Sequence, residues 1–167
     1  TAKANFGVQQ HDNNQFINAR LLSYKTIVYT LGLGTDTKLS SKTYLKYNAL
    51  YVPVKSKTSG FSSAAQKNSY FNQKTELVLL PVKPMIFKIN AEHQFYKSTS
   101  SDASDYLFLD LNVNWKFQKS QQEVTFSVIN LSNIKSYRTN YLSAYTNARS
   151  EYQLLGRFFQ VNYVFNF

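Results

Sequence analysis

The chain has 167 residues, a formal net charge of +10 and no cysteine. The lack of cysteine excludes a disulfide scaffold, a thiolate zinc site and a cysteine nucleophile. Only two histidines, His11 and His93, are present, so we expect no His-rich metal site. No run approaches the roughly 18 consecutive apolar residues of a membrane-spanning helix, which excludes a helical membrane protein. Aromatic residues make 16% of the chain, beside only five Gly and three Pro, and this proportion needs an explanation.

The hydrophobic pattern along the chain has a period of two, which predicts β-strands rather than helices. It starts weakly at 2–9, strengthens through 27–33 and 45–51, and blurs at 66–80. It is clearest in 106–117, where every second residue is apolar. The apolar set there is Leu107, Leu109, Leu111, Val113, Trp115 and Phe117, and Asp110, Asn112, Asn114 and Lys116 alternate with it. Successive side chains of a strand point to opposite faces, so one face of such a strand is apolar and the other is mostly wet.

We expect about eight strands, over 2–9, 17–34, 38–54, 66–80, 85–98, 105–118, 122–132 and 150–167. The connections between them alternate in length. Short ones are predicted at 35–37, 81–84 and 119–121, and long polar ones at 10–16, 55–65, 99–104 and 133–149. In an antiparallel meander this places all tight turns at one end and all long loops at the other. That arrangement is typical of an outer-membrane β-barrel.

Strand length and aromatic placement favour the membrane barrel over a soluble β-sandwich. Most predicted strands exceed the 9–11 residues that cross a membrane, whereas soluble strands usually have about 5–6. Aromatic residues gather at both ends of the strands. Phe87, Trp115, Phe117, Phe165 and Phe167 lie near the short turns, and Tyr51, Phe71, Phe95 and Tyr106 near the long loops. Two such bands predict the aromatic girdles at the two membrane interfaces.

The C-terminal stretch carries a family resemblance. It contains Asn130-Leu131-Ser132-Asn133, then a Tyr-rich loop, then Leu154-Leu155-Gly156-Arg157 and a final strand that ends at Phe167. This stretch resembles the end of TonB-dependent outer-membrane receptors of the SusC-like and carboxypeptidase-regulatory-like branches, although Ser132 stands where that family usually has Phe. The residues that match the motif are Asn130, Leu131, Asn133, Arg157, Phe165 and Phe167. A terminal Phe also resembles the signal read by the barrel assembly machinery.

The resemblance implies a location and a function. It implies the outer membrane of a Gram-negative bacterium, with residues 1–167 as one barrel segment, the last third of a 22-stranded barrel. The plug domain and the signal peptide would then lie before Thr1. The implied function is TonB-dependent uptake of a solute, with the plug and TonB as partners and a surface lipoprotein as a further one. The solute itself and the oligomeric state stay open.

The polar face of the predicted strands holds the candidate lumen residues. They are Lys46, Lys74, Glu76, Lys88, Glu92, Asp110, Lys116 and Glu123. Barrel interiors are polar and can hold a plug, and the mixture of charge signs suits a plug interface better than a filter of one sign. The alternative for each residue is that its charge only pairs with neighbours and water inside the wall.

The excess positive charge lies in or beside the long loops. These residues are Arg20, Lys55, Lys57, Lys67, Lys97, Lys135, Arg138 and Arg149. We expect them to attract lipopolysaccharide phosphates at the outer leaflet. In the loop 133–149, Tyr137, Arg138, Tyr141 and Tyr145 are candidates for solute or lipoprotein contacts, or for packing against neighbouring loops. Nucleic acid is not expected as a partner, because the aromatic rings mostly lie on the face opposite the charges.

No catalytic constellation is recognisable, so we expect no enzyme, no metal and no other cofactor. His11 lies in a predicted solvated loop, and His93 lies within a strand at an apolar position. Two alternatives to the receptor segment stay open. One is a complete small barrel of eight strands with an anchoring or surface-binding role. The other is a receptor-like barrel subunit of a larger outer-membrane complex that no longer transports.

Overall fold

The chain forms an all-β structure in the computed structural model, which describes residues 1–17, 20–59, 65–99, 102–117, 122–142 and 147–165. The strands are β1 (Ala2–Ile17), β2 (Arg20–Ser40), β3 (Thr43–Ser59), β4 (Gln66–Leu79), β5 (Met85–Ser98), β6 (Ser104–Phe117), β7 (Gln122–Ile129), β8 (Ser136–Leu142), β9 (Asn147–Gln153) and β10 (Phe158–Val164). Within these ranges no helix has the length and apolarity needed to cross a membrane.

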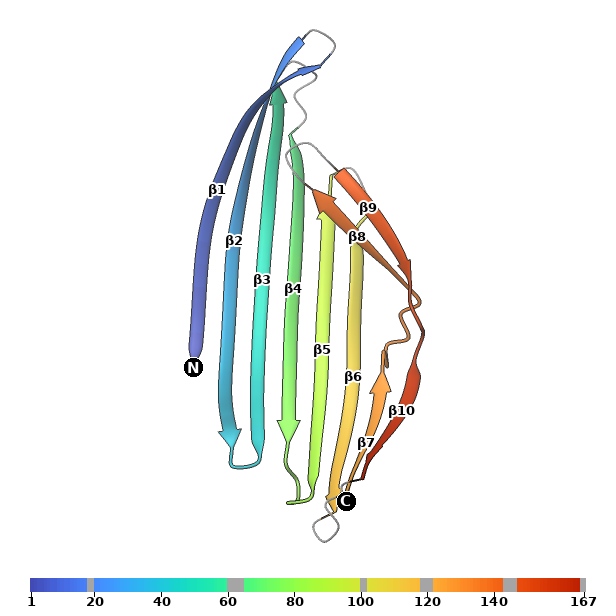
Figure 1. Cartoon of the computed structure of the whole chain (residues 1–167). Coiled ribbons are helices and arrows are strands. Elements are labelled where there is room, and N and C mark those ends of the chain that lie inside the picture. The colour runs from blue at the N-terminus through green and yellow to red at the C-terminus, as the bar shows by residue number, and fades with distance from the viewer. Residues whose placement is uncertain (18–19, 60–64, 100–101, 118–121, 143–146, 166–167) are drawn as a thin grey trace.

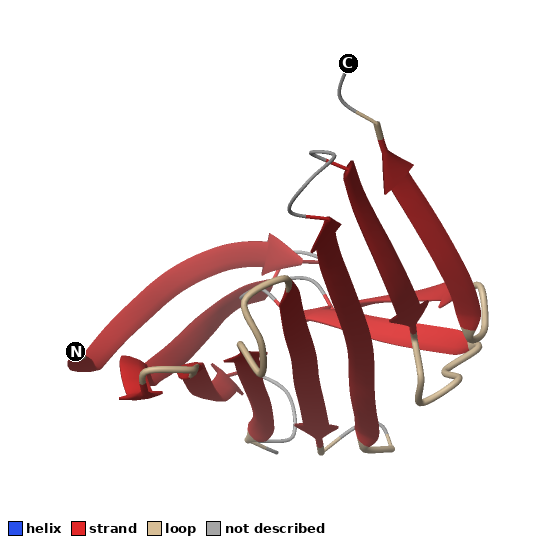
Figure 2. Ribbon diagram, turned by 90° about the horizontal axis from the view of Figure 1, so that it is seen from below, coloured by secondary structure: helices blue, strands red, loops and turns tan. Residues whose placement is uncertain are grey.

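Eight strands form one antiparallel sheet in the order β1-β2-β3-β4-β5-β6-β7-β10, and β8 pairs with β9 in a separate hairpin (Figure 1). The prediction of an all-β fold with a large antiparallel sheet is therefore confirmed. The sheet curves into an open arc with β1 at one edge and β10 at the other (Figure 2). Because these two edge strands do not pair, the described residues do not form a closed barrel.

The register gives the sheet one apolar and one polar face. Most apolar residues oppose another apolar residue on a neighbouring strand, as in Leu31–Tyr51, Leu77–Ile89 and Val113–Phe126. The apolar face includes Ala4, Phe6, Val8, Tyr29, Leu31, Leu33, Leu45, Ala49, Tyr51, Phe71, Leu77, Leu79, Phe87, Ile89, Ala91, Phe95, Leu107, Leu109, Leu111, Val113, Trp115, Val124, Phe126, Val128, Phe159, Val161 and Tyr163. A slip of one residue would exchange the faces of a strand, so this agreement over eight strands fixes the register.

The apolar face stays exposed. Among the described residues, Leu22 and Val128 are the only buried apolar side chains, whereas Phe6 is 69% and Phe159 65% exposed. The accessible surface is 11536 Å². A folded water-soluble monomer of 19.3 kDa exposes about 8,500 Å². The described structure therefore has no hydrophobic core of the size that its length would allow, and its apolar side chains lack a cover.

The predicted aromatic bands are only partly on one face. Tyr51 opposes Phe71, Phe71 opposes Phe95, and the Tyr51 and Phe71 rings lie 6.5 Å apart, edge to face. We call Tyr51, Phe71 and Phe95 the upper aromatic row. Tyr106 does not belong to it, because Tyr106 opposes Gln94 on the polar face. At the short-turn end, Trp115 opposes Met85 on the apolar face. This pair lies two residues nearer the short turns than the pair Phe87–Val113.

The first strands are longer than predicted. The segment 10–16, predicted as a loop, belongs to β1 and pairs with β2 as far as the pair Ile17–Arg20. His11 accordingly lies in a strand opposite Thr26 rather than in a loop. The turn predicted at 35–37 is also wrong: these residues lie in β2, and the chain turns at Ser41 and Lys42 instead. There the Lys42 amide donates to the Ser40 hydroxyl at 3.1 Å.

The C-terminal third also differs from the prediction. The predicted loop 133–149 contains β8 and the start of β9, which form a hairpin. The predicted strand 150–167 is divided, because residues 154–157 separate β9 from β10. β3 also runs on to Ser59, into the segment predicted as the loop 55–65.

Pro53 interrupts one ladder inside the sheet. β3 and β2 keep one register on both sides of it, from Val28–Val54 to Leu31–Tyr51, but the two pairs between are absent. Proline has no backbone N–H, so it cannot donate to β2. On its other side Pro53 still opposes Ser69 of β4.

Candidate functional site: the polar face of the sheet

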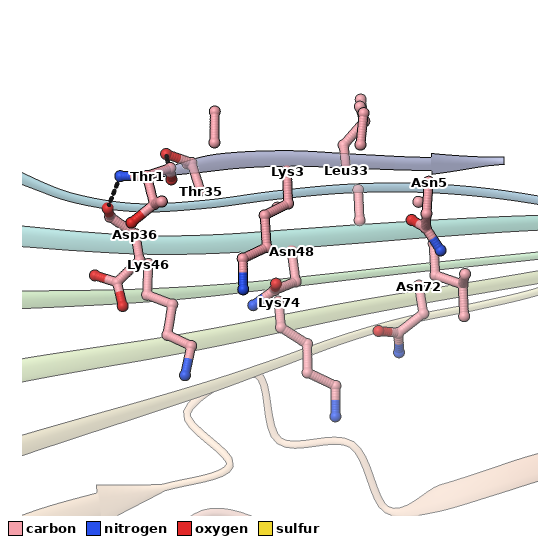
Figure 3. Close-up of a pocket in the computed structure, with 16 residues that line it drawn as sticks. Thr1, Lys3, Asn5, Leu33, Thr35, Asp36, Lys46, Asn48, Asn72 and Lys74 are labelled. Carbon is pink, nitrogen blue, oxygen red and sulfur yellow. Dashed lines mark hydrogen bonds between the residues drawn. The ribbon is translucent and has the colours of Figure 1, made fainter.

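The polar face carries charged and amide side chains from β1 to β6, set by the same alternation that builds the apolar face. Lys46 opposes Glu76, Lys74 opposes Glu92, and Asn90 opposes Asp110. Figure 3 shows Lys3, Lys46, Asn48, Asn72 and Lys74 projecting to one side of the strands while Leu33 projects to the other. The sheet therefore presents all eight predicted lumen residues on one surface, including Lys88, Lys116 and Glu123 on β5, β6 and β7.

Cross-strand ion pairs join most of these charges. The Lys88 ammonium lies 2.7 Å from the Glu76 carboxylate, and the Lys74 ammonium lies 3.1 Å from that of Glu92. Lys116 and Glu123, which oppose each other in register, are 3.4 Å apart. All three pairs are partly exposed, so each stabilises the sheet only slightly. Each of these pairs is electrically neutral, so six of the eight charges are compensated within the face.

Amide side chains extend the ion pairs into a network. The Glu92 carboxylate accepts hydrogen bonds from Asn72 at 2.8 Å and Gln94 at 2.6 Å as well as its pair with Lys74. At the other end, Asn114 donates to Glu123 and, at 2.9 Å, to the Thr125 hydroxyl. These amides were not predicted as site residues, although they have the same alternation as the charges and could have been found from it.

Two hollows lie over this face. The larger, of about 1090 Å³, is lined by β1–β4 and includes Lys3, Lys46 and Lys74 (Figure 3). The smaller, of about 300 Å³, is lined by five of the predicted lumen residues, Lys46, Lys74, Glu76, Glu92 and Asp110, together with Phe108. The arrangement can bind polar partners of either charge sign by hydrogen bonds and ion pairs.

Gly32 leaves the space that the Asn5 side chain occupies in the larger hollow. The Asn5 side chain lies across Gly32 of β2, and a Cβ atom at Gly32 would stand 1.9 Å from the Asn5 side-chain oxygen. Any larger residue at Gly32 would therefore displace Asn5 from the polar face.

The β8–β9 hairpin lies over the loop-side end of the polar face. The Tyr137 ring of β8 contacts the Tyr106 ring at 5.1 Å and the Phe108 ring at 5.6 Å, and its hydroxyl donates to Gln94. Burial raises the pKa of Tyr137 above its usual value, so the hydroxyl stays a donor at neutral pH. Arg138 pairs with Glu151 of β9 at 3.0 Å. A hollow of about 210 Å³ lies between the hairpin and the sheet.

The other predicted loop contacts are placed differently. Lys55 and Lys57 are exposed at the loop-side end of β3, on the apolar-face side. Tyr141 lies one residue before the end of β8, opposite Ala148 in register. Tyr145 lies outside the described residues. The structure therefore brings Tyr137 and Arg138 to the polar face and keeps the two lysines away from it.

The residues of the C-terminal motif meet where β7 ends. Asn130 and Asn133 both adopt positive φ angles, 55° and 57°, which asparagine tolerates better than most residues. The Asn130 amide group donates to the carbonyls of Ile134 at 2.8 Å and Leu155 at 2.9 Å and accepts from the Ile134 N–H at 3.0 Å. Its own N–H donates to the carboxylate of Asp110 at 2.8 Å.

Arg157 and Asn133 add hydrogen bonds at the same place, from the segment that leads into β10. The Arg157 side chain donates to the Leu131 carbonyl at 3.0 Å, and the Arg157 N–H donates to the Asn133 side chain at 3.1 Å. We call Asn130, Leu131, Asn133 and Arg157 the C-terminal joint. Phe165 lies just beyond β10, whereas Phe167 lies outside the described residues. The geometry gives the joint a structural role, which is to fix where the chain leaves the sheet after β7 and where β10 rejoins it.

One polar line crosses the apolar face. Tyr47 donates to Gln73 at 3.1 Å, Gln73 contacts His93 at 3.0 Å, and His93 contacts Asp105 at 2.7 Å. His93 was expected at an apolar position, and its face agrees. The polar partners were missed, because they come from three other strands and only the register brings them together.

Metal ligands do not gather in the described ranges: no group of three or more His, Cys, Asp or Glu there could hold an ion. Comparison of the chain with protein-family models, with curated proteins and with solved structures gave no match.

Proposed function

We propose that this chain is part of the wall of an outer-membrane β-barrel. One observation carries the proposal: an apolar face that continues over eight strands and stays exposed, back to back with a polar, ion-paired face. Monomeric soluble proteins rarely expose contiguous apolar patches larger than a few hundred Å². Membrane barrel strands alternate apolar residues toward lipid with polar residues toward the interior. Lipid supplies the missing cover of the apolar face.

The open sheet supports a segment of a larger barrel. Its edges, β1 and β10, carry unpaired backbone groups, which further strands would satisfy. Barrels of about 22 strands are wide enough to hold a plug. The mixed charges of the polar face suit contact with such a folded plug.

We further propose that the barrel belongs to a TonB-dependent receptor and takes part in the uptake of a solute. The support is the C-terminal motif, because four of its five described residues converge on one joint. In this proposal the polar face contacts the plug, and the β8–β9 hairpin covers the loop-side end of the lumen. Uptake is tested by deletion of the gene: loss of growth on a defined solute supports a transporter, and unchanged uptake of all solutes favours a subunit that does not transport.

Cysteine scanning tests the membrane proposal directly, because the chain has no native cysteine. Ile89 and Asn90 are neighbours on β5 that face opposite sides of the sheet. In outer membranes we expect a water-soluble maleimide to label Asn90→Cys and to leave Ile89→Cys unlabelled. A lipid-soluble maleimide should label Ile89→Cys. Equal labelling of both by the water-soluble reagent, in a protein that fractionates without membranes, would refute the proposal.

A complete small barrel is the second candidate. It is favoured by the even number of strands in the sheet, because β1 then begins and β10 then ends at the same, short-turn end (Figure 1). It requires β1 to pair with β10, although β1 has 16 residues and β10 has seven. The mass of the native polypeptide decides: a protein near 19.3 kDa that forms a heat-modifiable barrel alone supports it.

A further inference from the structure

Four lysines project from the apolar-face side of the sheet beyond the upper aromatic row. Lys55 and Lys57 belong to β3, Lys67 to β4 and Lys97 to β5, and all four are exposed. We call them the lysine patch. The residues that alternate with them on the polar-face side are neutral: Ser56, Thr58, Asn68 and Ser98. On these three strands, positive charge at this level is therefore confined to one side of the sheet.

The register brings like charges together in this patch. Lys55 directly opposes Lys67, and Lys57 directly opposes Lys25 of β2. Directly opposed side chains have Cβ atoms about 4.5–5.5 Å apart, and like charges so placed destabilise a sheet. Lys25 also opposes Asp12 of β1, which offsets its charge, so we leave it out of the patch.

The patch also lacks the acidic partners that other lysines have. On the polar face Lys74, Lys88 and Lys116 each pair with a glutamate. None of the ion pairs among the described residues includes a lysine of the patch. The Lys55 ammonium lies 5.8 Å from the centre of the Tyr29 ring, a contact that leaves its charge uncompensated. An external anion would relieve the repulsion between Lys55 and Lys67.

The position of the lysine patch along the strands indicates which anion it binds. Lys55 and Lys67 lie four residues beyond Tyr51 and Phe71, and Lys97 lies two residues beyond Phe95. At a rise of about 3.3 Å per residue this is about 7–13 Å along the strands. Aromatic rows of membrane barrels sit at the headgroup level. Lysines just beyond the row therefore reach lipid phosphates, while their aliphatic stems lie along the apolar surface.

We propose that the lysine patch binds the phosphate groups of anionic lipids in the leaflet at the long-loop end of the barrel, with one phosphate held between Lys55 and Lys67. The proposal rests on the proposed function, since it requires this face to contact a bilayer. It names the lipid that borders the wall at this point. An acidic protein segment or a nucleic acid would need no aromatic row beneath the lysines, so we favour the lipid.

The test uses the full-length protein purified in a neutral detergent. Native mass spectrometry measures the binding of dihexanoyl phosphatidic acid to the native protein and to the variant Lys55→Gln/Lys67→Gln. The matched control is Lys38→Gln/Lys83→Gln, which removes two exposed lysines near the short turns. We expect the patch variant to bind the lipid about thirtyfold more weakly and the control to change less than twofold. Lys55→Arg/Lys67→Arg should bind like the native protein.

Further arms separate the other occupants. Dihexanoyl phosphatidylcholine should bind the three variants and the native protein alike. Displacement of the lipid by an equal concentration of inorganic phosphate, or tighter binding of a polyglutamate peptide or an oligonucleotide, would overturn the proposal. So would equal loss in the patch and control variants.

Flotation of the native protein with phosphatidylcholine vesicles keeps the two proposals apart. If the protein floats but the patch variant binds phosphatidic acid normally, only the lipid proposal fails. If the protein does not enter vesicles at all, the membrane proposal fails, and the lipid proposal fails with it.

Discussion

Asparagine at the C-terminal joint shows how much a single residue can determine. Asn130 combines a left-handed backbone conformation with a side chain that satisfies three backbone groups from two segments, and it is 7% exposed. Alanine could not replace either contribution, because it disfavours positive φ and offers no hydrogen bond.

The first prediction therefore concerns Asn130. Asn130→Ala should lower the free energy of unfolding by about 3 kcal/mol, from backbone strain plus the unpaired carbonyls of Ile134 and Leu155. Asn130→Gly keeps the backbone conformation and should lose about 1 kcal/mol less. Denaturant unfolding of the purified protein measures both. Equal stability of Asn130→Ala and the native protein would contradict the role of the joint.

A second residue-scale prediction compares two glutamates of the polar face. Glu92 binds Lys74, Asn72 and Gln94, whereas Glu76 binds Lys88 alone in a partly exposed pair. Glu92→Ala should therefore destabilise by about 2 kcal/mol and Glu76→Ala by less than about 1 kcal/mol. The same unfolding assay ranks them. The reverse order would show that the amide network adds nothing to the ion pair.

At the scale of elements, the strands were predictable where one face is apolar along the whole strand. In β5 and β6 the alternation runs through the whole strand, and their bounds were predicted within one residue. In β1 it stops at Val8, because residues 9–15 are polar on both faces, yet backbone pairing with β2 continues. The β8–β9 hairpin was missed for the same reason: its strands lie over the sheet rather than in it and carry no alternation.

The site residues were likewise predictable where they lie in strands with a regular alternation and were missed or misplaced elsewhere. The eight charged residues of the polar face were found from the alternation along each strand alone, since an odd or even position fixes the face to which a strand residue points. Lys55 and Lys57 could be assigned to a face of the sheet only once β3 was known to continue to Ser59, because the prediction had placed both residues in a loop. The polar line from Tyr47 to Asp105 required cross-strand register, which one sequence does not determine.

The β8–β9 hairpin gives the element-scale prediction. Its attachment to the polar face depends on the Tyr137 ring and hydroxyl. Tyr137→Ala should release the hairpin, so that limited proteolysis cleaves it at least about tenfold faster than in the native protein. Arg138→Ala, which removes an exposed ion pair, is the matched control and should change the rate less than twofold. Equal cleavage rates in the two variants would place the attachment elsewhere.

At the scale of the whole molecule, the decisive feature is the pair of open edges. A barrel abolishes its edges by closure, and a membrane offers no water to unpaired backbone groups. In the proposed membrane barrel, β1 and β10 would therefore pair either with each other or with strands outside this chain. The 16 residues of β1 exceed the seven of β10, so mutual pairing would leave more than half of β1 unpaired. This mismatch favours separate neighbours for each edge.

Disulfide trapping distinguishes the two closures. Val161→Cys on β10 is combined with Ala4→Cys, Phe6→Cys or Val8→Cys on β1, three apolar-face positions that sample different registers. In outer membranes under oxidant we expect no bond in any combination, because other strands separate the edges. Phe126→Cys with Val161→Cys, which oppose each other on β7 and β10, should form the bond readily and shows that the oxidant reaches this depth. A bond between β1 and β10 at the level of that control would instead mean that these eight strands close on themselves. The lumen would then be filled by the side chains of the polar face, leaving no room for a plug.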